Sequence, residues 1–151
     1  MPEVKFIRFK PWHRKAIVTG SKYAGPTLDP TFSAEMARQT EGVTVLIDGT
    51  IAAILGVVVI WNGVGEVTLV PSEIFYKYPK TLIKTVKSLM EIAMDTWGLH
   101  RLHAMTLTTL PAHGKFLKTL GFVRETLDDG VVGYGPDGSS FHIWGYTKCK
   151  Q

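Results

Sequence analysis

The chain holds a single cysteine, Cys149, among its 151 residues. One cysteine cannot form a disulfide within the chain. This excludes the small secreted scaffolds that depend on disulfides, and it fits a reducing compartment. The segment Met1–Lys10 alternates charged and apolar residues and lacks the apolar stretch of a signal peptide. We therefore expect a cytoplasmic protein.

Long apolar runs are missing as well. The longest is Ile51–Trp61, far shorter than the roughly 20 residues that a membrane-spanning helix needs. This run is rich in β-branched residues, which favour a strand. We expect no membrane partner.

A strong charge of either sign is also absent, since the net charge is +4. So mild an excess is explained by solubility, or by attraction to an anion such as a phosphorylated cofactor or a nucleic acid. The sequence has no arginine-rich run and no interleaving of basic with aromatic residues, so sequence-specific binding of nucleic acid is not expected. The histidines show no metal-ligand spacing, so no metal is expected.

What the chain does have is enough apolar sequence for a core, at 45% of its residues. A length of 151 residues suits one domain, which we expect to span residues 1–151. Its middle predicts a three-stranded antiparallel meander, because two turn dipeptides that favour positive φ separate three apolar runs. The expected strands are Val43–Ile47, Thr50–Trp61 and Val64–Val70, with turns at Asp48-Gly49 and Asn62-Gly63.

The second half alternates helical and strand patterns. Apolar residues at three- and four-residue steps predict a long helix with Pro79 in its first turn and Gly98 after its end. A strand, a helix and a strand in succession predict a parallel crossover. The other expected strands are Val4–Phe9, Leu102–Thr108, Phe122–Leu127 and Phe141–Lys148; the other expected helices are Trp12–Thr19, one beginning at the N-cap Asp29, and Ala112–Leu120.

This order predicts an α/β (α+β) fold, with a mixed, mostly antiparallel central sheet, helices on both faces and one parallel crossover. Local motifs add to it. Phe116–Phe122 is a short helix that runs into Leu-Gly-Phe, Leu69-Val70-Pro71 ends a strand, and Arg124-Glu125 precedes a Gly/Asp-rich loop. With these motifs the chain resembles the GNAT (Gcn5-related N-acetyltransferase) superfamily, from Val4 to Lys148.

The resemblance implies acetyl-CoA as cofactor. Backbone groups of Leu69 and Val70 would pair with the pantetheine arm. The start of the next helix would face the pyrophosphate, with Lys77, Lys80 and Thr81 as its contacts. The sequence departs from the family here, because 77–82 holds no glycine to wrap the phosphates and Pro79 removes one N–H donor. The alternative is that these lysines are only a solvated helix start.

The resemblance also implies the catalytic groups. Glu66 on the fourth strand is the candidate general base, and Glu73 is the second choice. The family's asparagine and its acidic tyrosine are replaced by Leu110 and Leu117. Tyr134 is the candidate substitute for that acid. The alternatives are that Glu66 is a hairpin charge and Tyr134 an ordinary loop aromatic.

Two functions follow. One is an N-acetyltransferase that uses acetyl-CoA to acetylate an amine on a small molecule or a protein. The other is a catalytically inactive protein, similar to the GNAT-like proteins of tailed bacteriophages, with a structural role in the virion or its assembly, or a role in binding a host protein. The second implies a location in the host cytoplasm or the virion and virion proteins as partners. A homodimer is a further candidate assembly, because an exposed apolar edge could pair.

Overall fold

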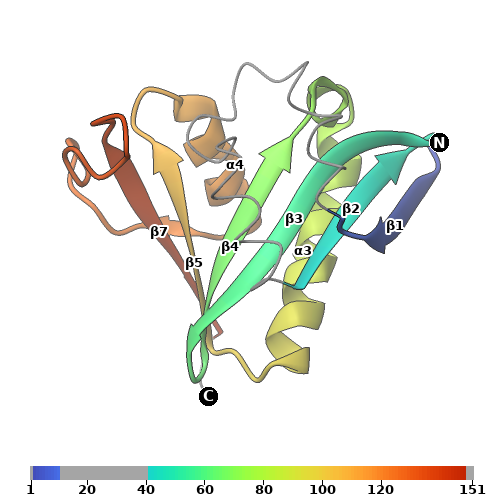
Figure 1. Cartoon of the computed structure of the whole chain (residues 1–151), viewed down its shortest axis with the longest axis horizontal. Coiled ribbons are helices and arrows are strands. Elements are labelled where there is room, and N and C mark those ends of the chain that lie inside the picture. The colour runs from blue at the N-terminus through green and yellow to red at the C-terminus, as the bar shows by residue number, and fades with distance from the viewer. Residues whose placement is uncertain (1, 11–40, 149–151) are drawn as a thin grey trace. The chain divides into compact units, whose positions relative to one another are not determined.

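The computed structural model of the chain describes residues 2–10 and 41–148 (Figure 1). The helices predicted over Trp12–Thr19 and from Asp29 lie outside these residues, as does Cys149. No helix in the described residues is long and apolar enough to cross a membrane.

Seven strands form one mixed sheet in the order β1-β2-β3-β4-β5-β7-β6. The pair β4–β5 is parallel, and β1–β2, β2–β3, β5–β7 and β6–β7 are antiparallel. The strands are β1 (Val4–Arg8), β2 (Glu41–Ile47), β3 (Thr50–Trp61), β4 (Val64–Pro71), β5 (Arg101–Leu107), β6 (Val123–Arg124) and β7 (Phe141–Thr147); the helices are the 3₁₀ helix η2 (Glu73–Lys77), α3 (Pro79–Thr96) and α4 (Pro111–Leu120).

The chain divides into two compact units. The first holds the described parts of 1–58 together with 67–82, so it contains β1, β2, most of β3, the end of β4, η2 and the first turn of α3. The second holds 59–66 and the described residues from 83 onwards. The single domain over 1–151 stays a prediction.

The first unit is built on the predicted hairpin. Asp48 and Gly49 have φ angles of 48° and 81°, the two positive values that a type I′ turn requires. Figure 1 shows β1, β2 and β3 side by side, as the strand pairing gives them. Ile54 and Val70 form a buried cluster on which Phe9 and Ile51 pack. This packing fixes the end of β4 through the side chain of Val70.

The second unit is built on β5, β7 and α4, and Figure 1 shows the two strands side by side. Trp144 on β7 donates its indole N–H to Thr106 Oγ1 on β5 at 2.9 Å, in the buried interior. Gly114 on α4 lies against the same indole, because a Cβ there would be 2.8 Å from Trp144 Cζ2. The helix therefore covers the face of β5 that carries Leu102, Ala104 and Thr106.

The Leu-Gly-Phe motif ends α4 as its sequence predicts. Gly121 takes the left-handed conformation with φ 104°, and the Phe122 N–H donates to Leu117 O at 3.0 Å. The ring of Phe122 is buried. This is the backbone geometry that glycine supplies at the end of a helix.

The prediction of a strand over Phe122–Leu127 was wrong in length, since β6 covers only Val123–Arg124. The backbone of Phe122 is taken up by the helix end. Beyond β6, the Glu125 N–H still bonds Ile143 O, but the Ile143 N–H donates to Thr126 Oγ1 at 3.3 Å. A side-chain oxygen thus replaces the carbonyl that would have continued the strand. The 3₁₀ helix η2 was not predicted.

Candidate functional site

Glu66 lies in the parallel ladder of the sheet, opposite His103. The register between β4 and β5 includes the pairs Val64–Arg101, Gly65–Leu102 and Glu66–His103. The side chain of Glu66 is half-buried. Burial raises the pKa of its carboxyl above the ordinary value, and the positive charge of His103 acts in the opposite direction. A carboxylate with a raised pKa is a stronger base than one in water.

His103 belongs to the face of β5 that points away from α4, because side chains alternate along a strand. Its antiparallel partner on β7 is Gly145. The space above Gly145 is filled by the Arg101–Glu125 ion pair, since a Cβ on that glycine would lie 2.7 Å from Arg101 Nη1 and from Glu125 Oε2. Glycine is therefore required here to let the ion pair lie flat on the sheet.

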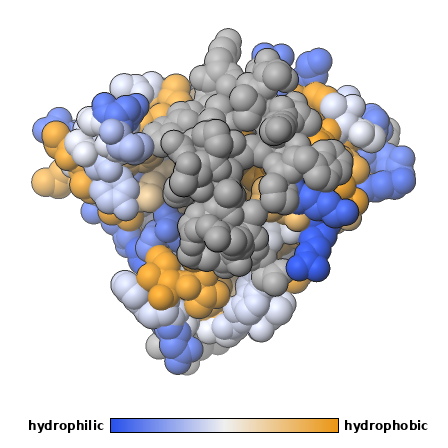
Figure 2. All heavy atoms as spheres, viewed as in Figure 1, coloured by the Kyte–Doolittle hydropathy of each residue, from blue (hydrophilic) through white to orange (hydrophobic). Residues whose placement is uncertain are grey.

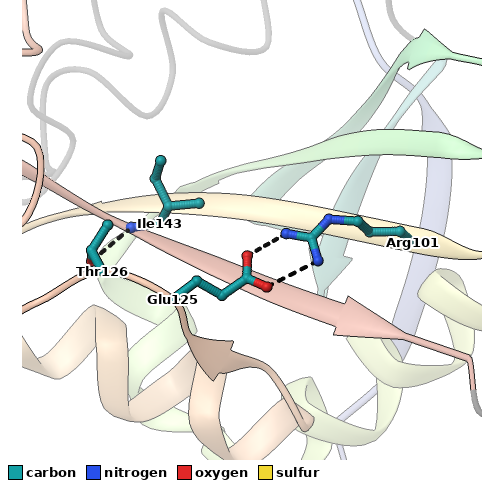
Figure 3. Close-up of polar contacts among 4 residues, drawn as sticks. All are labelled: Arg101, Glu125, Thr126 and Ile143. Atoms are coloured by element: carbon teal, nitrogen blue, oxygen red, sulfur yellow. Dashed lines mark hydrogen bonds and ion pairs between the residues drawn. The ribbon is translucent and has the colours of Figure 1, made fainter.

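The Arg101–Glu125 pair is bidentate (Figure 3). Arg101 Nη1 donates to Glu125 Oε2 at 3.0 Å, and Arg101 Nη2 donates to Glu125 Oε1. The hydrogen bonds from Arg101 lower the pKa of the Glu125 carboxyl, and His103 lowers it further. Thus His103 interacts with a carboxylate on either side, Glu66 and Glu125.

The predicted cofactor residues all lie in the first unit. Leu69 and Val70 are near the end of β4, Lys77 ends η2, and Lys80 and Thr81 lie in the first turn of α3. The structure thus brings the five predicted residues into one unit. Lys77 and Lys80 are exposed, so their ammonium groups are accessible to an anion.

The connection between β4 and α3 is fixed by Ser72. Its N–H donates to Ala52 O at 2.8 Å and its Oγ donates to Ile51 O at 2.8 Å. Both the backbone and the side chain of Ser72 are therefore hydrogen-bonded to β3. Phe75 in η2 is buried and meets Tyr76 edge-on. The intrahelical hydrogen bonds of α3 begin with the Leu82 N–H donating to Tyr78 O at 3.0 Å. The N–H groups of the residues before Leu82 therefore have no intrahelical acceptor.

Tyr134, the candidate acid, lies in the segment that links β6 to β7. It is 56% exposed and packs edge-on against Phe141, with ring centroids 5.9 Å apart. Leu127 and Val132 in the same segment are 87% and 76% exposed. Figure 2 shows apolar surface over this segment, at the left of the view. Tyr134 is thus an exposed residue with an aromatic contact, and its role as the acid stays a prediction.

The structure also describes three other positions discussed in the sequence analysis, together with one histidine, His113, that was not discussed there. Leu117, at the family's tyrosine position, is buried in α4, and Leu110 is the N-cap residue of that helix. Glu73, the second choice of base, is exposed at the start of η2. Burial lowers the pKa of His113 in the first turn of α4, which favours its neutral form. Among the described residues no group of His, Cys, Asp and Glu could hold a metal ion.

Sequence reasoning missed His103 and the Arg101–Glu125 pair as members of a polar face. A signal for the first was present, because Arg101 and His103 alternate with the apolar residues Leu102 and Ala104. Glu125 lies 24 residues from Arg101, and their contact depends on which strands become neighbours. No local pattern carries that information.

Comparison with known proteins identifies the fold. No protein-family model and no curated protein matches the sequence. Solved structures do match. A GNAT-family acetyltransferase from Streptococcus pneumoniae aligns over 97% of this chain and 100% of its own, with 14% identity and a TM-score of 0.66. Ard1 from Thermoplasma volcanium aligns over 97% and 99%, with 15% identity and a TM-score of 0.72.

The chain has the GNAT fold. The predicted fold class is thereby confirmed. Spermidine N-acetyltransferase from Vibrio cholerae, in complex with CoA and spermine, also has this fold; it aligns over 95% of both chains with 8% identity and a TM-score of 0.70. At such identities the match establishes the GNAT fold, and the activity has to be argued from residues.

Proposed function

We propose that this GNAT-fold protein is an N-acetyltransferase that uses acetyl-CoA to acetylate an amine. The observation that carries the proposal is Glu66, a half-buried carboxylate with a raised pKa that is paired with His103 in the parallel ladder between β4 and β5. A general base must have a pKa close enough to the working pH to accept a proton and still be ionised. Burial moves Glu66 toward that range.

In the proposed mechanism Glu66 accepts the proton that the amine loses as it becomes acylated. Acetyl-CoA supplies the acetyl group as a thioester. The carboxylate acts directly or through one water molecule, and its half-buried position limits competition from bulk water. A positioned base of this kind contributes about 10²–10⁴-fold to rate.

The residues of the first unit fit the anionic part of acetyl-CoA. The α3 N-terminus offers the N–H groups of Lys80 and Thr81 and the positive end of a helix dipole, and the first turn of α3 holds no acidic residue. The side chains of Lys77 and Lys80 add two positive charges. Pro79 contributes no donor, so positive charge takes the place of the glycine-wrapped loop. Backbone groups of Leu69 and Val70 would hold the pantetheine arm.

The acceptor is a small-molecule or protein amine. One neighbour of the same fold is a spermidine N-acetyltransferase solved with CoA and spermine, which makes polyamines a reasonable first group to test. An ionised Glu66 would also attract a protonated amine before the reaction. Tyr134 stays a candidate for the acid that protonates the departing thiolate.

Release of free thiol from acetyl-CoA, in the presence of a panel of polyamines, amino acids and peptide N-termini, tests the proposal. Acetylated amine should appear with thiol in equal amounts. Glu66→Gln should lose both, whereas Glu91→Gln, an exposed position on α3, should keep them. Thiol release without acetylated product would indicate hydrolysis and would count against the proposed transfer.

A catalytically inactive GNAT-like protein is the second candidate, and two observations favour it. Pro79 and the absence of glycine in 77–82 weaken a phosphate cradle, and the buried Leu117 offers no acid where the family has one. In this case the fold would serve a structural role in the virion or its assembly, or bind a host protein. Failure to bind acetyl-CoA would favour this candidate.

A further inference from the structure

His103 lies between two carboxylates of different character. Neighbouring strands are about 4.7–4.9 Å apart, so a ladder partner on β4 or β7 is an immediate neighbour of His103. On β4 that partner is Glu66. On β7 it is Gly145, and the Glu125 carboxylate lies above this glycine. The charge of His103 acts on both carboxyl groups.

The two carboxylates differ in how their charge is compensated. Glu125 accepts hydrogen bonds from both terminal nitrogens of Arg101. Within the described residues, Glu66 makes no ion pair, and it is the more buried of the two. An imidazolium at His103 therefore stabilises Glu66 more than it stabilises Glu125, because the charge of Glu125 is already neutralised.

The other charged groups near His103 can be named for each neighbouring strand. On β5 itself Arg101 is two residues away on the same face, and its guanidinium is turned toward Glu125. On β7 the residues on this face are Ile143, Gly145 and Thr147, and none of these titrates. On β4 the only titratable residue is Glu66. Among the residues on these strands, all within the described part of the chain, the uncompensated charge beside His103 is thus that of Glu66.

We infer that His103 is a positioning residue for Glu66: it stands beside that carboxylate on the neighbouring strand, and its positive charge favours the ionised carboxylate. The Arg101–Glu125 pair gives the second carboxylate a cation of its own, so His103 is left to act on Glu66. Gly145 is what permits this arrangement.

A catalytic use of the Glu66–His103 interaction rests on the proposed function, since the proton that Glu66 accepts must come from an amine. The charge of His103 would help to keep Glu66 a carboxylate, which attracts a cationic amine and then accepts the proton that the amine releases. The acidic limb of the pH–rate profile would accordingly depend on His103.

The test is a carboxyl ¹³C NMR titration of the full chain, with the Glu66 signal assigned by its loss in Glu66→Gln. Three variants are compared with the unchanged protein. His103→Gln removes the charge, His103→Lys keeps a positive charge, and His142→Gln makes the same change on the opposite face of β7, where His142 bonds Thr126. Near-ultraviolet circular dichroism checks that each variant is folded.

We expect the Glu66 midpoint to move to higher pH in His103→Gln and to return toward the starting value in His103→Lys, with His142→Gln unchanged. Where acetyl transfer is present, its acidic limb should move in the same direction. A Glu66 midpoint that does not respond to His103→Gln, or that responds equally to Gln and Lys, would overturn the inference. If the titration behaves as expected but no acetyl transfer occurs, the proposed function fails while the Glu66–His103 coupling stands.

Discussion

At the scale of single residues, the proposed chemistry depends on the charge of Glu66. Its carboxyl is half-buried, which makes ionisation cost more than it does in water. His103 offsets part of that cost. The balance leaves a carboxylate that is more basic than a surface glutamate, and this property can be measured in two independent ways.

The first measurement is activity. Glu66→Gln keeps the size of the side chain and removes the base, so kcat for acetyl transfer should fall by about 10²–10⁴-fold. The Kd for acetyl-CoA should be unchanged, because the cofactor residues lie elsewhere on the chain. Glu91→Gln on α3 is the matched control and should leave kcat as it was. A kcat for Glu66→Gln within twofold of the starting value would remove Glu66 from the mechanism.

The second measurement is stability against pH. Because the folded state raises the pKa of Glu66 above its unfolded value, the stability associated with its neutral form is full below the unfolded pKa and is lost as pH rises through the folded pKa. A glutamine at this position does not ionise, so it does not lose this stability as the pH rises. The Tm of Glu66→Gln relative to the unchanged protein should therefore be higher at pH 8 than at pH 4. A Tm difference that is constant with pH, or one that reverses, contradicts the burial of the charge.

At the scale of elements, the start of α3 is the part on which cofactor binding depends. Lys77→Ala together with Lys80→Ala should raise the Kd for acetyl-CoA about 5- to 30-fold, from roughly 0.5–1 kcal/mol for each exposed charge. The effect should shrink as salt is added, because the lysines are exposed. Lys87→Ala with Lys118→Ala removes the same charge at other exposed positions, and calorimetry should find little change. Equal effects from the two pairs would mean that only net charge matters.

The packing of α4 against Trp144 is a second feature at this scale that can be tested. A Cβ at Gly114 would lie 2.8 Å from Trp144 Cζ2, so Gly114→Ala must displace either the helix or the indole that bonds Thr106. Overpacking of this kind costs about 1–3 kcal/mol. Denaturant unfolding should show that loss, whereas Lys115→Ala, on the exposed side of the same helix, should change stability little. A stable Gly114→Ala would mean that the contact can relax without cost.

The elements that could be predicted from sequence are those set by local chemistry. The turn at Asp48-Gly49 and the left-handed end of α4 at Gly121 need positive φ, and the residues that tolerate it stand there. The hairpin at Asn62-Gly63 is present too, although only Gly63 has a positive φ. The strand that begins near Phe122 was predicted to be too long, because its end depends on a hydrogen bond between Thr126 and Ile143, which is distant in sequence.

At the scale of the whole molecule, the order of elements predicted the sheet, and the GNAT fold follows from it. The residues of the candidate site fall into two groups, those that could be named from the sequence and those that could not. Glu66 and the lysines could be named because the resemblance assigns roles to positions along the chain. His103 could not, since its role arises from sitting between β4 and β7, which are neighbours of β5 in space and distant in sequence.

The central claim is that this GNAT fold binds acetyl-CoA, and a calorimetric titration paired with thermal unfolding tests it most directly. Acetyl-CoA at a hundred times its Kd should stabilise the protein by about 2.7 kcal/mol. For a chain of this size that corresponds to a rise in Tm of roughly 5–11 °C. Absence of both binding heat and a Tm shift at millimolar acetyl-CoA would contradict the account and leave the inactive GNAT-like protein as the better description.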